Sequence, residues 1–207
     1  QSSKYTTFSM KKIETIWLHL LDQAIENRVF QHTQAGLAEL FHFSTSTINL
    51  ALDKPTAVGA VRKSGKFFVV ADPLKLLYLA STIRNLAKDI IYQTTSSLSI
   101  HELEGLVPPT AIYGGYSAAT QILGEAPADY STLYLYADPD DLTEIKSRYP
   151  LSKTGSTNII ILKKPPYLQE IGHTSLAHTF IDTWNMSDWY AHDFTQALEV
   201  KIHDILS

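Results

Sequence analysis

The sequence has no cysteine, only two methionines and no long uninterrupted apolar run. Without cysteine the chain cannot form a disulfide, a thiolate zinc site, an iron–sulfur cluster or a cysteine nucleophile. No uncharged apolar run approaches the roughly 18 residues of a membrane span, and the first ten residues lack the apolar core of a signal peptide. We therefore expect a cytoplasmic protein without membrane segments.

The composition is that of an ordinary globular chain. Its 207 residues are 44% hydrophobic, 11% aromatic and 18% charged, which excludes intrinsic disorder and allows one large core or two smaller ones. Because Met10-Lys11-Lys12 resembles a natural start, residues 1–9 are expected to be a flexible tail outside the fold.

Charge is divided unevenly along the chain. Residues 1–88 carry 11 Lys and Arg against 6 Asp and Glu, a balance of +5, whereas residues 89–207 carry 6 against 15, a balance of −9. A basic first half is a feature of proteins whose N-terminal module binds nucleic acid. We accordingly predict two domains, over residues 10–88 and 89–207.

In the first half, helical signals come before strand signals. Apolar residues recur at helical spacing from Ile13 to Phe30. Thr33 and Ser44 are placed to cap a second helix that ends near residue 42 and a third over residues 45–53, and Pro55 is expected to end or kink that third helix.

Two β-prone runs over residues 58–70, joined by the polar residues 63–66, predict a hairpin with a basic tip. Asp72-Pro73 then predicts the start of another helix, which could run on to Leu86. Helix, helix, turn, helix and hairpin is the element order of a winged helix-turn-helix.

The segment from Gln34 to Val70 also resembles winged-helix regulators of the kind found among prokaryotic transcription factors. The resemblance rests on the residues from Leu37 to Phe41, from Ser46 to Leu52 and from Gly59 to Gly65. It implies that the helix over residues 45–53 enters the major groove of double-stranded DNA and that the basic wing, residues 62–66, contacts the backbone. The residues predicted to contact DNA are Gln34, Ser44, Thr45, Ser46, Thr47, Asn49, Lys54, Arg62, Lys63 and Lys66.

The second half mixes predicted strands and helices, which makes the whole chain an α+β protein. Strands are predicted at residues 111–113, 133–136 and 158–162. Helices are predicted at 99–106, at 117–123, after a cap at Asp138, and as one or two closing helices over 177–205, whose aromatic residues form core or a dimer surface.

The stretches 113–119, 129–136 and 177–194 resemble a nucleotidyltransferase-like domain of the sort joined to winged helices in AbiE-type antitoxins and related regulators. In that fold a glycine pair opens a helix, as Gly114-Gly115 does here, and a strand carries two carboxylates that bind Mg²⁺. Leu133 and Leu135 occupy the two carboxylate positions in this chain. The resemblance therefore implies a mixed α/β domain that is non-catalytic.

Neither metal-binding nor catalytic motifs are evident elsewhere. The histidines lack ligand spacing, since His173 and His178 are five residues apart, and Asp129 and Asp138 lie on opposite sides of the predicted strand. We expect no enzyme, no metal and no cofactor.

Three functions remain open at this stage. The first is a homodimeric, sequence-specific DNA-binding transcriptional regulator. The second is an antitoxin-like protein whose acidic C-terminal domain binds a protein partner. The third is a nucleotide-binding or nucleotidyltransferase enzyme, which the two leucines oppose.

Overall fold

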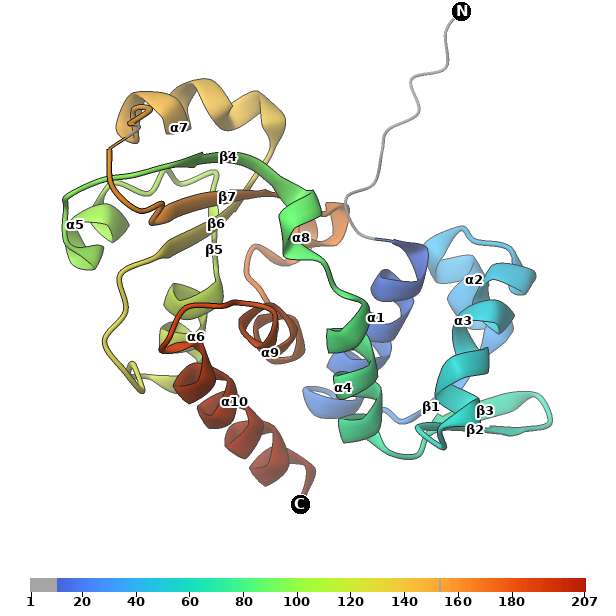
Figure 1. Cartoon of the computed structure of the whole chain (residues 1–207). Coiled ribbons are helices and arrows are strands. Elements are labelled where there is room, and N and C mark those ends of the chain that lie inside the picture. Colours follow the sequence, from blue (N-terminus) through green and yellow to red (C-terminus); the bar gives the residue numbers. More distant parts are fainter. Residues whose placement is uncertain (1–10, 153) are drawn as a thin grey trace, which may run out of the picture.

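The computed structural model describes residues 11–152 and 154–207, so the expected tail over residues 1–9 lies outside the described residues. The fold is mixed α+β with two small sheets (Figure 1). In the first half the elements are α1 (Lys12–Ile25), β1 (Gln31–Thr33), α2 (Gln34–Phe41), α3 (Thr45–Ala57), β2 (Val61–Ser64), β3 (Phe67–Val70) and α4 (Pro73–Ile83).

The second half is built on a four-stranded sheet in the order β4-β7-β6-β5, in which only β6 and β7 are parallel. Its elements are the 3-10 turn η1 (Leu86–Asp89), β4 (Ile90–Thr94), α5 (Ile100–Gly105), β5 (Ile112–Gly114), α6 (Gly115–Leu123), β6 (Leu133–Ala137), the 3-10 turn η2 (Pro139–Asp141), α7 (Leu142–Arg148), β7 (Ile159–Lys163), α8 (Pro166–Ile171), α9 (Leu176–Trp184) and α10 (Ala191–Leu206).

Helices cover both faces of this sheet. Helix α7 lies over one face, and α6, α9 and α10 lie on the other (Figure 1). Every residue of β6 is buried, with Leu133 and Leu135 in the cluster under α7 and Tyr134 and Tyr136 in the larger cluster on the opposite side. The prediction of a strand that is covered on both faces is confirmed.

Three helix starts follow directly from local sequence. The hydroxyl of Thr33 accepts a hydrogen bond from the amide of Gly36, that of Ser44 from Thr47, and the carboxylate of Asp72 from Lys75. Each side chain satisfies an amide that has no partner within its helix. The predicted caps of α2, α3 and α4 are confirmed, although α4 ends at Ile83 and does not continue to residue 86.

The first helix is shorter than its apolar periodicity predicts. It ends at Ile25, and Arg28 then adopts a left-handed φ of 58°. Residues 31–33 form the unpredicted strand β1, which pairs antiparallel with β3 and gives the first sheet the order β1-β3-β2. The predicted hairpin is confirmed, and its two-residue turn uses Gly65 at a φ of 59°.

Pro55 neither ends nor breaks α3, which continues to Ala57. A proline has no amide hydrogen, so the carbonyl of Ala51, four residues earlier, loses its helical partner. The indole Nε1 of the buried Trp17 on α1 donates a hydrogen bond of 2.7 Å to that carbonyl. The expectation that Pro55 ends the helix was wrong, because a side chain 34 residues from Ala51 replaces the missing donor.

One buried cluster contains residues from both halves of the sequence. Helices α1 and α4 pack against α9, and the cluster runs from Ile16 and Leu76 to Phe180 and Phe194 (Figure 1). Strand β4 begins at the residue directly after η1. The predicted domain boundary near residue 89 therefore falls between two adjacent elements with no linker between them. The two-domain division remains a prediction.

Candidate nucleic-acid interface

Helix α3 presents a continuous exposed face. The exposed residues of this face follow one another at intervals of about one helical turn. Ile48, Ala51 and Leu52, on the opposite face, are buried against the rest of the fold. The exposed residues along the centre of this face are Ser46, Asn49, Leu50, Asp53 and Lys54. Trp17 fixes the depth and rotation of the helix through its bond to Ala51.

The hairpin is tied to α3 through Asn49. Nζ of Lys63 on β2 donates a hydrogen bond of 2.8 Å to Oδ1 of Asn49 and lies 3.5 Å from Oδ1 of Asp53. Nε2 of Gln34, at the start of α2, also donates to Oδ1 of Asn49, at 3.5 Å. Three of the residues predicted to contact DNA, Gln34, Asn49 and Lys63, are therefore brought together at one point.

The other predicted residues of this region lie at the two ends of α3. The hydroxyl of Ser44 caps α3 and also lies 2.9 Å from Oγ1 of Thr47. Thr45 and Ser46, in the first turn of α3, are exposed, and so is Lys54 toward its other end. Amides at the start of a helix carry partial positive charge, so this end of α3 can receive an anionic group such as a phosphate.

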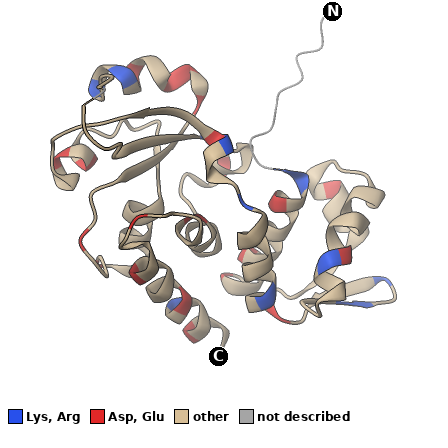
Figure 2. Ribbon diagram, viewed as in Figure 1, with Lys and Arg blue, Asp and Glu red and all other residues tan. Residues whose placement is uncertain are grey.

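Two basic residues of the hairpin are exposed. In the described part of the chain, the side chains of Arg62 and Lys66 make no hydrogen bond or ion pair, in contrast to that of Lys63. Basic segments mark the hairpin in Figure 2, and a basic and an acidic segment lie side by side on α3. The acidic neighbour is Asp53, whose charge Lys63 partly balances.

Leu50 was not among the residues predicted to contact DNA. Its side chain is 65% exposed on α3, next to Asn49, and Phe67 at the hairpin turn is 48% exposed. An exposed apolar side chain on such a face can contact the methyl group of thymine. The exposure of Leu50 could have been inferred from helical spacing, because Leu50 lies four residues after Ser46 and therefore on the same face of the helix.

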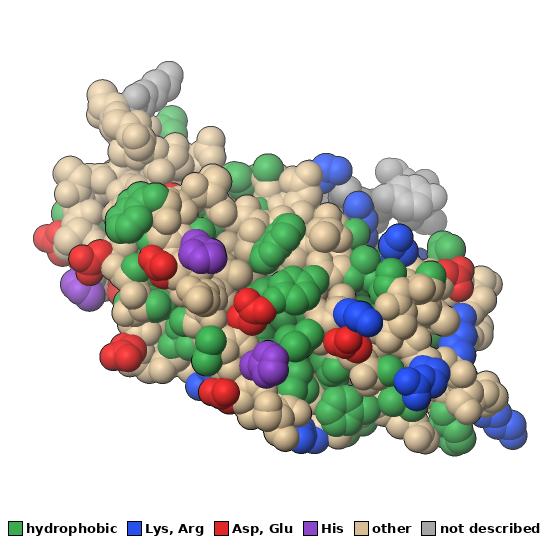
Figure 3. Space-filling view, turned by 60° about the horizontal axis from the view of Figure 1, so that its bottom comes forward, with side chains coloured by type: hydrophobic (Ala, Val, Ile, Leu, Met, Phe, Trp, Pro, Cys, Tyr) green, Lys and Arg blue, Asp and Glu red, His purple; other side chains and the backbone are tan. Residues whose placement is uncertain are grey.

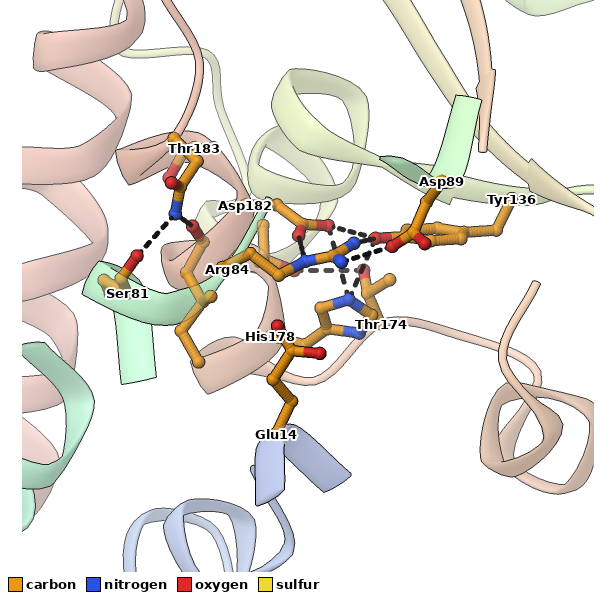
Figure 4. Close-up of polar contacts among 12 residues, drawn as sticks. Glu14, Ser81, Arg84, Asp89, Tyr136, Thr174, His178, Asp182 and Thr183 are labelled. Carbon is orange, nitrogen blue, oxygen red and sulfur yellow. Dashed lines mark hydrogen bonds and ion pairs between the residues drawn. The ribbon is translucent and has the colours of Figure 1, made fainter. Parts of the chain in front are cut away.

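A second cluster of polar residues lies where α4, η1, β6 and α9 meet (Figure 4). Nε of Arg84 donates to Oδ1 of Asp182 at 3.1 Å, NH2 donates to the hydroxyl of Tyr136 at 3.1 Å, and NH1 pairs with Asp89. Oη of Tyr136 lies 3.0 Å from Nε2 of His178. Arg84 thus joins the end of α4 to the sheet and to α9.

This cluster is closed to solvent. Arg84 is 6% exposed, and Asp89, Tyr136 and Asp182 are at most 2% exposed. Burial lowers the pKa of His178 to about 4, against the opposing effect of the Asp182 carboxylate, so the imidazole is neutral at pH 7. Because these polar and charged groups are buried and pair with one another, we assign the cluster a structural role.

The glycine pair has a packing reason in this fold. Gly115 has a φ of 53°, and a Cβ on it would lie 2.6 Å from Cε of Met186. The turn from β5 into α6 therefore needs glycine whether or not a phosphate is bound.

Asp129 precedes β6 and Asp138 follows it. Asp138 occupies the predicted cap position, but its carboxylate pairs with Nζ of Lys164 at 2.9 Å and does not cap the turn. Among the described residues, no group of three or more His, Asp or Glu side chains is placed to hold a metal ion.

The closing aromatic residues divide into two sets. Phe180, Tyr190 and Phe194 are buried, as expected of core. Trp184 is 43% exposed and Trp189 is 79% exposed, both near the junction of α9 and α10. On the face shown in Figure 3, acidic side chains predominate toward the left and basic side chains toward the right.

In the described ranges 11–152 and 154–207, no helix is both long and apolar enough to cross a membrane. Comparisons with models of protein families, with curated proteins and with solved structures found no match to this chain.

Proposed function

We propose that this chain is a sequence-specific DNA-binding transcriptional regulator of the cytoplasm, with residues 10–88 acting as a winged helix-turn-helix. Helix α3 enters the major groove, and the β2–β3 hairpin lies on the neighbouring phosphate backbone. The observation that carries this proposal is the contact between Lys63 and Asn49, because it holds the hairpin beside the exposed face of α3.

The chemistry of the face agrees with a division of labour between base and backbone contacts. Asn49 carries a carboxamide, which can pair with the major-groove edge of adenine, and Leu50 can lie against a thymine methyl. Arg62 and Lys66 are exposed cations suited to phosphate. Asp53 is the one acid on the centre of this face, and its pairing with Lys63 reduces its repulsion of DNA.

In this proposal the second half is a non-catalytic, nucleotidyltransferase-like domain that brings two copies together. The buried positions of Leu133 and Leu135 support the absence of a metal-dependent transfer reaction. The exposed tryptophans Trp184 and Trp189 supply apolar surface for a homodimer contact. Two copies would present two α3 helices to a palindromic site.

A second candidate function shares the same surface. Residues 89–207 carry a balance of −9, and two exposed tryptophans within an acidic region suit a protein partner with a basic surface. This is the antitoxin-like alternative, in which DNA binding serves autoregulation. Analytical ultracentrifugation of the purified chain distinguishes the two: a dimer that is lost in Trp184→Ala/Trp189→Ala favours self-association, and a monomer in both favours a different partner.

The experiment that tests the main proposal is a selection of genomic DNA fragments by the purified full chain at near-physiological salt. We expect enrichment of a palindromic site, bound at nanomolar concentrations. Failure to enrich any fragment over random DNA would remove DNA binding from the account and leave the partner-binding candidate.

A further inference from the structure

A cavity of about 600 Å³ lies between α1, the turn that joins α2 to α3, and the segment from residue 165 to 175 that contains α8. Its volume is in the range of small-molecule sites in proteins. One side of α1 forms its floor, through Thr15, His19 and Asp22, which follow one another at helical spacing. The cavity lies apart from the exposed face of α3.

Negative charge predominates around this cavity. Glu26 and Glu170 contribute two carboxylates and Asp22 a third once it ionises above its raised pKa of about 7, against the single ammonium of Lys12. His19 adds no charge near pH 7, since burial lowers its pKa to about 4 with a further contribution from His32. An anionic ligand would be repelled, and a cationic ligand would be attracted.

Asp22 is incompletely satisfied within the protein. Its Oδ1 is buried and has no hydrogen-bond partner. Burial raises the pKa of Asp22 to about 7, a hydrogen bond from Ser175 opposes this rise, and Glu26 adds to it. A buried carboxylate oxygen without a donor is unfavourable, so a ligand that brings a charged donor gains a strong interaction here.

Apolar and aromatic residues form much of the remaining wall. Phe41 is the last residue of α2, Phe43 lies in the turn after it, and Tyr167 comes from α8. Nζ of Lys12 already lies 4.8 Å from the ring centroid of Phe43, which places an ammonium group over an aromatic face at the cavity. The cavity therefore offers apolar area together with one carboxylate oxygen, Oδ1 of Asp22, that lacks a donor.

We infer that this cavity is a binding site for a small organic cation with a flat apolar body, whose ammonium group donates to the carboxylate of Asp22. The inference stands on the cavity and on Asp22, and it is independent of whether α3 binds DNA. Because Phe43 lies directly before the residue that caps α3, the site is also adjacent to the proposed DNA-binding helix.

The test uses three probes with the same indole ring and different end groups: tryptamine, its alcohol analogue tryptophol, and indole-3-propionate. Isothermal titration calorimetry of the full chain at pH 8, where Asp22 is ionised, measures each affinity. We expect tryptamine to bind, tryptophol to bind about tenfold or more weakly, and the carboxylate probe not to bind. Equal affinity for all three, or no heat with any of them, would overturn the inference.

Two variants locate the site, and a third is the control. Asp22→Asn keeps the size of the side chain and should weaken tryptamine about tenfold or more. Thr15→Phe fills the cavity from its floor and should abolish binding of tryptamine. Asp193→Asn, an exposed residue on α10 outside the cavity, should bind as the wild type does. Unchanged affinity in Asp22→Asn, with circular dichroism confirming a folded protein, would refute the assignment.

Discussion

Lys63 on the β2–β3 hairpin donates a hydrogen bond to Oδ1 of Asn49 on α3, across 14 residues of sequence. The bond restricts the rotation of the exposed carboxamide and leaves its amide group as a donor. A carboxamide whose rotation is already fixed loses less conformational entropy when it pairs with adenine. Lys63 is thus a positioning residue in the proposed interface.

The first prediction concerns this pair. Asn49→Ala should weaken binding to the selected DNA site by about 1–3 kcal/mol and relax sequence preference at one base pair. Lys63→Ala should relax the preference at the same base pair, and the double variant should lose less than the sum of the two single variants. Fluorescence anisotropy titrations on a set of singly substituted sites measure this coupling, and additive losses at different base pairs would argue against the positioning role.

The second prediction separates backbone contacts from base contacts. Arg62→Ala/Lys66→Ala should weaken binding to all DNA sequences alike, because each lost phosphate contact removes about 0.9 from the slope of log affinity against log salt concentration. The control is Lys88→Ala/Lys146→Ala, which removes the same charge from exposed positions outside the hairpin and α3. Salt titrations should give a slope lower by about two for the hairpin variant. An equal fall in both double variants would point to net charge alone.

The third prediction concerns the support of α3. Trp17→Phe keeps most of the apolar area but removes the donor to Ala51, so the carbonyl above Pro55 is left without a partner. We expect unfolding free energy to fall by about 1–3 kcal/mol. Urea denaturation followed by circular dichroism measures it. The reference is Trp17→Phe/Pro55→Ala, in which the alanine amide restores a donor within α3, and most of the loss should be recovered. No recovery would show that the indole acts by packing alone.

The fourth prediction concerns pH. The pKa of Asp22 is about 7 in the folded protein and near 3.8 in the unfolded chain. Between these values the unfolded chain is ionised at Asp22 while the folded protein keeps its proton, so this residue makes stability fall as pH rises from about 4 to 7. Asp22→Asn removes the effect. We compare the unfolding free energy of the variant with that of the wild type at each pH. This difference should be about 1–3 kcal/mol more in favour of the variant at pH 8 than at pH 4.5. A difference that does not change with pH would contradict the buried position of this carboxyl.

Features that depend on neighbouring residues could be predicted from the sequence. The caps Thr33, Ser44 and Asp72 each bond an amide three residues ahead, so the residues that decide the helix start are adjacent in the chain. The hairpin turn at Gly65 and the fully apolar strand β6 are also local signals. These predictions succeeded because no distant partner was needed.

Features that depend on distant partners could not be predicted. Strands β1 and β4 are short, and each exists because it pairs with a strand far along the sequence, β3 and β7 respectively. The continuation of α3 through Pro55 needs Trp17. The buried guanidinium of Arg84 needs the carboxylate of Asp182, which lies 98 residues away in the sequence. The same limit applies to the candidate interface: Asn49 and Lys63 could be named from the sequence, but their contact and the exposure of Leu50 could not.

The most direct test of the central claim is chemical footprinting of the selected DNA site with dimethyl sulfate, which methylates N7 of guanine in the major groove. We expect the full chain to protect guanines in two half-sites, with centres about 10 base pairs or a multiple apart, and Asn49→Ala to weaken this protection. Protection confined to the minor groove, or none at a concentration that saturates the site, would contradict the placement of α3 in the major groove.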